Sequence, residues 1–360
     1  MPTESIIYLH NFEMESMHSQ QTKMDAKEDN LQFLGFNGIY KEAYKIIISW
    51  KKIFTQITLV LFLPLSLLLL VHIVFTYMYF ERLVGYNYWL YDTEYNKVGR
   101  EYYNKSLDLA SSELIACWLF HIAYRTFALT FSCPSTFVVV FIISCVYTGR
   151  EDDVTFRRVR TIVPKVWKRL KVTFWWALLT FLSYYGFVAL GLLGWGYFVG
   201  LANYASKIVV IVLLISFEAG LMYFMSVWQM ASVVSILEDT HGIQAMKRSM
   251  EVTRGKRWMT VLILLKLNLF IFFIQVVFEI YVVDGQFLGM LPRVGLGILC
   301  LGLVLYLNIL TLVIQTIIYF VCKSCRYHEN TAAKTTLSDQ LDGYLTGLLK
   351  DNKHVELAAV

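Results

Sequence analysis

The chain has 360 residues, of which 57% are hydrophobic and only 16% are charged, and its mean hydropathy is positive. This composition excludes an ordinary soluble domain and a disordered chain, and it is typical of a protein that crosses a membrane several times. The formal net charge of +5 does not indicate nucleic-acid binding, because the basic residues are spread over separate segments beside apolar runs.

The first segment, residues 1–36, is polar and contains acids, Gln and His instead of a basic start followed by an apolar core. We expect a disordered cytosolic N-terminus without a cleavable signal peptide, so that the first crossing acts as the insertion signal. The following residues place Ile39 and Ala43 on one helical face and Lys41 on the opposite one. This pattern predicts a basic amphipathic helix at the membrane surface.

Apolar runs of about 20 residues, the length that one helical crossing needs, occur six times. They lie at Ile53–Tyr79, within Leu114–Tyr147, and at Val172–Leu193, Ile208–Leu237, Met259–Val283 and Gly295–Cys322. The second run is too long for one straight crossing, so we place its crossing near Phe127–Tyr147 and expect its first part, with His121 and Arg125, to be an interfacial or tilted extension. The sequence predicts an all-α integral membrane protein with six transmembrane helices in three hairpins over residues 37–328.

The segment between the first two crossings, residues 81–112, is rich in Tyr and is expected to be a lumenal or extracellular loop. It contains Asn104-Lys105-Ser106, the acceptor pattern for N-glycosylation. Asn104 is therefore a glycosylation candidate whose modification would report the side of the membrane on which the loop lies.

Basic residues also precede the other two hairpins. Residues 150–171 include Lys168 and Arg169, and Pro164 is expected to split this segment into two short helices. The third copy, at residues 243–254, places Ile243, Met246 and Met250 on one face and Lys247, Glu251 and Arg254 on the other, with Arg248 beside them. Each hairpin thus follows a basic amphipathic helix, and the alternation of basic loops predicts that both termini are cytosolic.

Two ionisable residues interrupt the later crossings. Glu218 lies near the middle of the fourth crossing and Lys266 lies about two turns into the fifth, and Glu279 and Gln275 extend this polar set. The Glu218–Lys266 pair either fixes the register of neighbouring helices or lies on a solute or proton pathway.

The last crossing ends at Cys322-Lys323-Ser324-Cys325, followed by a cytosolic tail at residues 329–360. One CxxC pair without a second does not indicate zinc, whereas Cys322 and Cys325 are candidates for S-palmitoylation. The sequence contains no recognised catalytic motif, and we expect no enzyme activity, catalytic residue, cofactor or metal.

Five long blocks carry a family resemblance. They read LQFLGFNGIYKEAYKIIISWKKIFTQITLVLFLPLS (31–66), VPKVWKRLKVTF (163–174), WQMASVVSILEDTHGIQAMKRS (228–249), RVGLGILC (293–300) and VIQTIIYFVCKS (313–324). Over residues 24–350 the chain resembles a plant family of six-span transmembrane proteins of unknown function. Related chains begin near the position of Met24, so residues 1–23 depart from the family pattern.

Members of that family are sometimes labelled as polyadenylate-binding-protein-binding proteins, and nothing in these residues gives that label physical support. The block at residues 237–258 is more remotely similar to the membrane domains attached to some bacterial glycerophosphodiester phosphodiesterases. The soluble domain that carries their chemistry has no counterpart in this sequence. The resemblance therefore implies a fold and a membrane location but no catalytic residue.

These patterns favour a non-enzymatic scaffold or adaptor of the endoplasmic reticulum, endomembrane system or plasma membrane. Its basic interfacial helices would meet anionic lipid headgroups or unknown protein partners. The alternative is a transporter or channel that moves a small solute or lipid with Glu218 and Lys266. An enzyme that acts on lipids is a third, weaker hypothesis.

Overall fold

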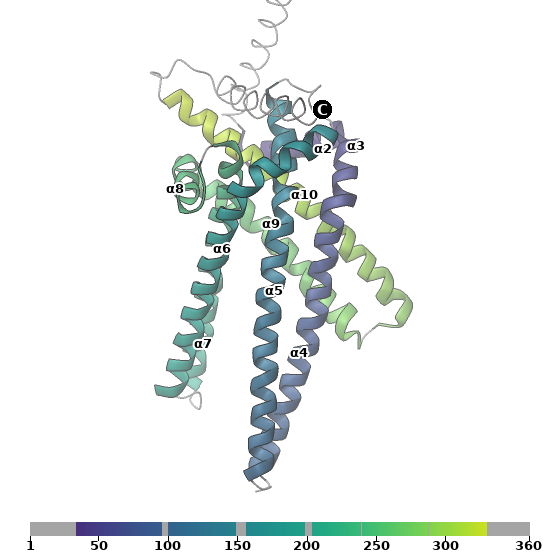
Figure 1. The fold of residues 1–360 in the computed structure, drawn as a ribbon, viewed down its shortest axis with the longest axis vertical. Coiled ribbons are helices and arrows are strands. Elements are labelled where there is room, and N and C mark those ends of the chain that lie inside the picture. Colours follow the sequence, from purple (N-terminus) through teal and green to yellow (C-terminus); the bar gives the residue numbers. More distant parts are fainter. Residues whose placement is uncertain are drawn as a thin grey trace, which may run out of the picture. The chain divides into compact units, whose positions relative to one another are not determined.

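The computed structural model describes residues 34–95, 100–148, 156–198, 204–238, 240–286 and 288–329, and regular structure within these ranges is entirely helical (Figure 1). The elements in chain order are α2 (Phe36–Ser49), α3 (Lys51–Ile57), a π-helical segment η1 (Thr58–Phe62), α4 (Leu63–Tyr95), α5 (Arg100–Tyr147), α6 (Phe156–Phe198), α7 (Tyr204–Leu237), α8 (Ile243–Val252), α9 (Arg257–Phe278), a second π-helical segment η3 (Glu279–Asp284) and α10 (Met290–Glu329). The predicted all-α class is confirmed. Most of the predicted N-terminal segment and all but the first residue of the tail lie outside the described residues.

Five helical stretches among the described residues are long and apolar enough to cross a membrane. They are Lys51–Arg82, Ile115–Tyr147, Ile208–Leu237, Arg257–Asp284 and Met290–Cys325. Each contains or overlaps one of the predicted crossings, and together they indicate a membrane-embedded protein. The remaining predicted crossing, Val172–Leu193, lies within α6, whose side chains are described only in part.

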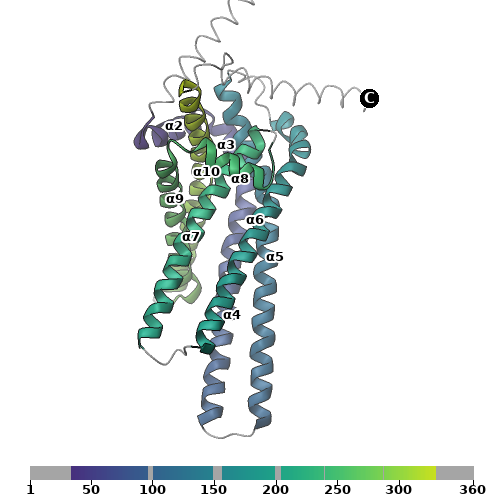
Figure 2. The ribbon, with the colours of Figure 1, turned by 90° about the vertical axis from the view of Figure 1, so that its left-hand side faces the viewer.

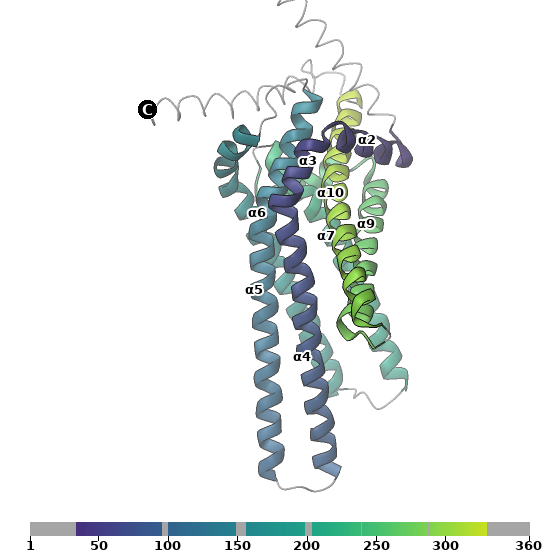
Figure 3. The same ribbon diagram turned by 90° about the vertical axis from the view of Figure 1, so that its right-hand side faces the viewer.

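The segment between the first two crossings, predicted as a lumenal or extracellular loop at residues 81–112, is mostly helical. The α4 helix continues to Tyr95 and α5 begins at Arg100. Figures 1 and 3 show α4 and α5 lying side by side as a long hairpin. With 48 residues, α5 is about 72 Å long, more than twice the thickness of a hydrocarbon core.

Two prolines lie inside continuous helices. The first part of the Leu114–Tyr147 run, predicted as an interfacial or tilted extension, continues into the crossing without a break, because α5 is one helix that continues through Pro134. Pro164 does not split its segment, because α6 is one helix from Phe156. A proline removes one backbone hydrogen bond and bends a long helix, but the neighbouring turns keep their own bonds.

The chain divides into two compact units, which we describe separately. The first comprises residues 1–55, 133–266 and 310–360, and the second comprises residues 56–132 and 267–309. In the first unit, every residue of α5 from Ser135 to Tyr147 is buried, as is every residue of α10 from Val313 to Cys322. Helices that are apolar on all sides form the inside of a helical bundle, so these two stretches lie in the core of this unit.

The short helices of the first unit pack against protein. In α2, the buried residues are Ile39, Ala43 and Ile46, which lie on the face that the sequence predicts to be apolar. Figure 2 shows α8 lying across α6 and α7, where Ala245 and Met246 join a cluster that includes residues of both helices. The apolar sides of α2 and α8 thus contact the bundle itself.

The second unit has a smaller core. Leu70 and Ile73 of α4, Phe278 of α9 and Cys300 of α10 form its buried cluster. Tyr77 of α4 adds a polar contact, because its hydroxyl lies 2.9 Å from an Asp284 carboxylate oxygen. In the second unit, α4 of the long hairpin is therefore joined to the segment that connects α9 and α10.

Candidate functional site

The most extensive polar contact of the first unit surrounds Glu238, the residue that follows α7. Its Oε2 atom accepts a hydrogen bond from Nε of Arg248 in α8 at 2.8 Å. Its Oε1 atom accepts a hydrogen bond from the Tyr319 hydroxyl of α10 at 2.9 Å and lies 3.3 Å from Nζ of Lys323. Lys323 also donates to the Tyr319 hydroxyl at 2.8 Å. We call these four residues the Glu238 cluster.

The Glu238 cluster is stabilised by opposite charges at a half-buried position. The side chains of Glu238 and Lys323 are 15% and 13% exposed, so each would be costly to bury without the other. Burial by itself raises the pKa of the Glu238 carboxyl, but the charge of Lys323 and the hydrogen bonds and charge of Arg248 outweigh burial and lower that pKa below its ordinary value. The carboxylate is therefore ionised at neutral pH and joins α7, α8 and α10.

The turn between α7 and α8 is positioned by a hydroxyl pair. Thr173 of α6 and Ser235 of α7 lie 3.0 Å apart through their hydroxyl oxygens, and the backbone N–H of Gly242 donates to the Thr173 hydroxyl at 3.0 Å. Gly242 has φ +62°, and a Cβ atom there would lie 2.8 Å from Cδ1 of Trp176. Glycine is thus required twice at the start of α8, for its conformation and for the close approach of α6.

The faces of α8 agree with the prediction in part, because Met246 is buried and Glu251 is exposed. Its buried residues are Ala245, Met246, Ser249 and Val252, whereas Ile243 is 45% exposed. Small residues allow α8 to approach α6 and α7 closely, so the buried face is not the one with the largest side chains. Lys247 and Arg254 are exposed, but Arg248 binds Glu238 and Glu251 and its charge is neutralised within the protein.

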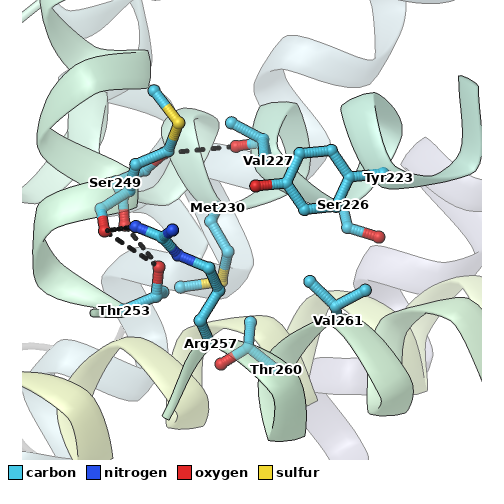
Figure 4. A pocket seen from close by; sticks show the side chains of 10 residues that line it. Tyr223, Ser226, Val227, Met230, Ser249, Thr253, Arg257, Thr260 and Val261 are labelled. Carbon is cyan, nitrogen blue, oxygen red and sulfur yellow. Dashed lines mark hydrogen bonds between the residues drawn. The ribbon is translucent and has the colours of Figure 1, made fainter. Parts of the chain in front are cut away.

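A small pocket lies where α7, α8 and α9 adjoin (Figure 4). Its lining residues are Tyr223, Ser226, Val227 and Met230 of α7, Ser249 and Met250 of α8, Thr253 of the following turn, and Arg257, Thr260 and Val261 of α9. Ser249 contacts the Val227 carbonyl at 3.3 Å, and Nη2 of Arg257 donates to the Met250 carbonyl at 3.1 Å. Arg257 thereby binds the C-terminal end of α8, where a cation is favourable.

The four small hydroxyls of this pocket already donate hydrogen bonds within the protein. Those of Ser226, Ser249, Thr253 and Thr260 each donate to a backbone carbonyl of the preceding helical turn or bend. Their remaining capacity is to accept hydrogen bonds, so the guanidinium of Arg257 is the cationic donor of the lining.

The turn from α8 to α9 lies next to this pocket and shares Arg257 with its lining. Arg254, Lys256 and Arg257 place three cations around Gly255, and the next residue, Trp258, is 79% exposed. The turn is held by backbone bonds from Arg254 to Glu251 and from Lys256 to Thr253, each 3.0 Å long. We call residues 254–258 the basic turn.

Comparison with known proteins identifies one family. The model of the family described as Domain of unknown function (DUF8558) matches residues 24–359, which is most of the chain. The chain belongs to this family. The match begins at the position where the sequence resemblance begins. No curated protein and no solved structure matches the chain, so the comparison assigns no activity.

In this DUF8558 member, the structure describes only one side chain of the predicted Glu218–Lys266 pair, that of Lys266. The side chain of Glu218 lies outside the described residues, although its backbone lies in α7. Lys266 lies with Nζ 5.9 Å from the ring centre of Phe36 and 5.7 Å from that of Tyr40, both in α2. The described contact of Lys266 is thus a cation–π contact that joins α9 to α2.

The other predicted site residues are dispersed. The side chains of Asn104, Lys168 and Arg169 lie outside the described residues, although their backbones are helical in α5 and α6. Glu279 is exposed at the start of η3, and Gln275 is partly buried one turn earlier. These residues remain predictions.

The two C-terminal cysteines differ in accessibility. Cys322 is buried, with Sγ 4.0 Å from the Thr260 hydroxyl, whereas Cys325 is partly exposed. A modifying enzyme would reach Cys325 more readily. No group of three or more His, Cys, Asp or Glu side chains in the described part of the chain could hold a metal ion.

Sequence reasoning missed Glu238 and Tyr319, and it named Lys323 only as part of the segment from Cys322 to Cys325. One signal was present, because Tyr319 and Lys323 are four residues apart and therefore lie on one helical face. Their carboxylate partner lies 81 residues from Tyr319 in sequence and becomes visible only in three dimensions.

Proposed function

We propose that this protein is a six-span, non-enzymatic membrane scaffold whose basic turn binds anionic lipid headgroups at the cytosolic surface. The sixth crossing in this proposal is Val172–Leu193 of α6, and both termini are cytosolic. The observation that carries the proposal is the exposed Trp258, which follows three cationic residues at the start of the apolar α9 helix.

The chemistry of the basic turn supports a lipid as its ligand. Tryptophan is enriched at the boundary between headgroups and hydrocarbon, where its ring is partly apolar and its N–H remains hydrated. Each basic residue near an anionic membrane surface contributes about 1 kcal/mol of attraction. Arg254, Lys256 and Arg257 together would contribute about 3 kcal/mol, which corresponds to roughly a hundredfold in affinity.

The framework behind the turn supports a scaffold. α8 is joined to α7 and α10 by the Glu238 cluster, and Arg257 binds the end of α8. A lipid held at the basic turn would therefore contact a turn that is joined to three helices. We infer that such a surface selects the membrane or partner beside which the protein resides, in the endomembrane system or the plasma membrane.

The test is retention of phosphatidic acid by the purified protein, measured by native mass spectrometry with phosphatidylcholine as the neutral reference. The R254Q/K256Q/R257Q variant should retain roughly one-hundredth as much phosphatidic acid and an unchanged amount of phosphatidylcholine. The matched control, K41Q/K51Q/K52Q, removes the same charge from exposed residues of α2 and α3 and should keep most of the retention. Equal losses in both variants would contradict a site at the basic turn.

The alternative of a transporter makes a separate prediction. If protein in liposomes moved a solute or lipid, and Glu218→Gln abolished that movement in a folded protein, the scaffold proposal would fail.

A further inference from the structure

A pair of histidines joins the two helices of the long hairpin. Nε2 of His72 in α4 lies 2.9 Å from Nδ1 of His121 in α5. Both side chains are partly buried, and both belong to the second unit. None of the sites discussed above involves this contact.

The histidine pair lies well inside the apolar spans. The spans of α4 and α5 meet their polar boundary near the ion pair between Arg82 and Glu113, whose charged atoms are 3.5 Å apart. The separation between Arg82 and His72 in sequence corresponds to about 15 Å along a helix. Since a hydrocarbon core is about 30 Å thick, the pair falls within it.

Aromatic rings surround His72. The Phe120 and Tyr124 rings stack on it with centres 5.6 and 3.7 Å away, and the His121 ring meets it edge-on at 4.8 Å. Stacked rings exclude water and also favour a cation through their electron-rich faces. The pair is thus shielded by rings whose faces favour one positive charge, although burial itself opposes that charge.

Other titratable groups near the pair limit that charge. Arg125 of α5 is a permanent cation that acts on both imidazoles, and Cys117 lies one helical turn before His121. From η3, which packs against α4, Asp284 contacts Tyr77 at 2.9 Å, more than one turn away from His72. With Arg125 close by, two further positive charges on adjacent imidazoles would repel one another strongly.

The distance between the two nitrogens determines how many protons the pair can hold. A nitrogen-to-nitrogen distance of 2.9 Å requires one proton between the atoms, because two bare lone pairs repel and two N–H groups clash. The neutral pair has one donor and one acceptor at this contact. A protonated pair, with one imidazolium and one imidazole, keeps the same bond, whereas a doubly protonated pair cannot.

We propose that His72 and His121 form an intramembrane proton-binding site that takes up a single proton from water and shares it across the α4–α5 contact. The ligand is the proton itself. Uptake changes the pair from neutral to singly charged, without breaking the bond between Nε2 and Nδ1. A second proton would break the hydrogen bond between His72 and His121 and so remove this contact between α4 and α5.

The structure also provides a control that keeps the hydrogen bond but cannot titrate. The amide of Gln can occupy the place of an imidazole Nε2, and the amide of Asn can occupy the place of Nδ1. The H72Q/H121N variant therefore preserves a hydrogen bond across the contact and removes both titratable rings. Its thermal unfolding at neutral pH should match that of the native protein.

The first measurement is proton uptake by the full chain in nanodiscs between about pH 8 and pH 3, a range that includes uptake by partly buried imidazoles beside a cation. The native protein should take up one proton more than H72Q/H121N. A difference of two protons would show independent imidazoles, and a difference of zero would show a permanently neutral contact. Either result would overturn the proposal.

The second measurement locates the proton. Solid-state NMR of the protein with ¹⁵N-labelled histidine should show a coupling across the N–H···N bond at neutral pH. The coupling should persist after the single uptake step and be absent from the H72Q single variant. Loss of the coupling during the single uptake step would contradict a shared proton.

Discussion

The Glu238 cluster and the histidine pair join helices by different chemistry. The Glu238 cluster lies near the ends of two apolar spans, those of α7 and α10, where a carboxylate, a guanidinium, an ammonium and a phenol meet within 3.3 Å. The histidine pair lies inside apolar spans and uses two groups that are neutral or share a single charge. Fixed opposite charges thus occur where water is near, and the contact within the span uses side chains that need carry no net charge.

Because of this difference, we expect the two contacts to respond differently when one of their residues is substituted. Removing one member of a fixed ion pair leaves its partner charged and half-buried, which is costly. Removing one member of a neutral pair leaves only an unsatisfied hydrogen-bonding group. The Glu238 cluster should therefore be the more sensitive to substitution.

The largest expected effect is that of Glu238→Gln. The change leaves Lys323, which is 13% exposed, without its carboxylate, and it weakens the anchoring of Arg248. We expect the free energy of unfolding to fall by about 2–3 kcal/mol, somewhat less than for a fully buried pair. Thermal or steric-trapping unfolding in a membrane mimetic measures this change.

Glu251→Gln is the matched control. Glu251 binds the same Arg248 at 3.2 Å, but its side chain is 60% exposed. Its loss should cost at most about 0.5 kcal/mol. Equal effects of the two substitutions would contradict the special role of Glu238.

A smaller effect is expected for Gly242→Ala, which tests whether the position of α8 supports the cluster. The added Cβ would lie 2.8 Å from Cδ1 of Trp176, and the alanine backbone would have to adopt φ +62°. We expect a loss of about 1–2 kcal/mol, measured by unfolding as above. Gly255→Ala is the control, because a Cβ atom added there would have no heavy atom within 4 Å and the φ of Gly255 is not positive. A neutral effect at Gly242 would show that α8 can shift freely.

The pH dependence of stability separates the two contacts further. Because the pKa of folded Glu238 lies below its unfolded value of 4.5, its stabilising contribution is complete above about pH 4.5 and is lost as pH falls through the folded pKa. The difference in stability between the native protein and E238Q should therefore be constant near neutrality and shrink in acid. A difference that shrinks between pH 7 and 6 instead would contradict this assignment.

The smallest effect is expected at the polar boundary of the hairpin. Arg82 pairs with Glu113, but its side chain is 58% exposed. Arg82→Gln should change the free energy of unfolding by about 0.5 kcal/mol or less. A loss comparable to that of E238Q would show that the hairpin also relies on a fixed ion pair.

In this protein the sequence predicts which segments are helical far better than it predicts which side chains contact one another across the fold. The apolar runs predict the helices because a crossing of the membrane leaves few alternatives, and the periodicity in α2 predicts its buried residues Ile39, Ala43 and Ile46. For α8 the sequence predicts the buried Met246 and the exposed Lys247 and Glu251, but it misses the burial of Ala245 and Ser249, small residues that allow close packing.

Long-range polar contacts were beyond the reach of local patterns. In the sequence, Glu238 follows an apolar run and looks like an ordinary solvated residue at a helix end. Its contacts with Tyr319 and Lys323 form only in the folded protein. On α5, Glu113, Cys117, His121 and Arg125 recur every four residues, a polar stripe that indicates a partnered face. The stripe does not reveal that His72 is the partner of His121.

The central claim, that the basic turn binds anionic lipid, is tested most directly by cross-linking. A phosphatidic acid analogue with a photoreactive group near its headgroup would be incorporated into nanodiscs with the native protein, and the labelled peptides would be sequenced. The account predicts labelling concentrated at residues 254–259 and lost in R254Q/K256Q/R257Q. Labelling spread evenly over the basic segments, or unchanged in that variant, would contradict it.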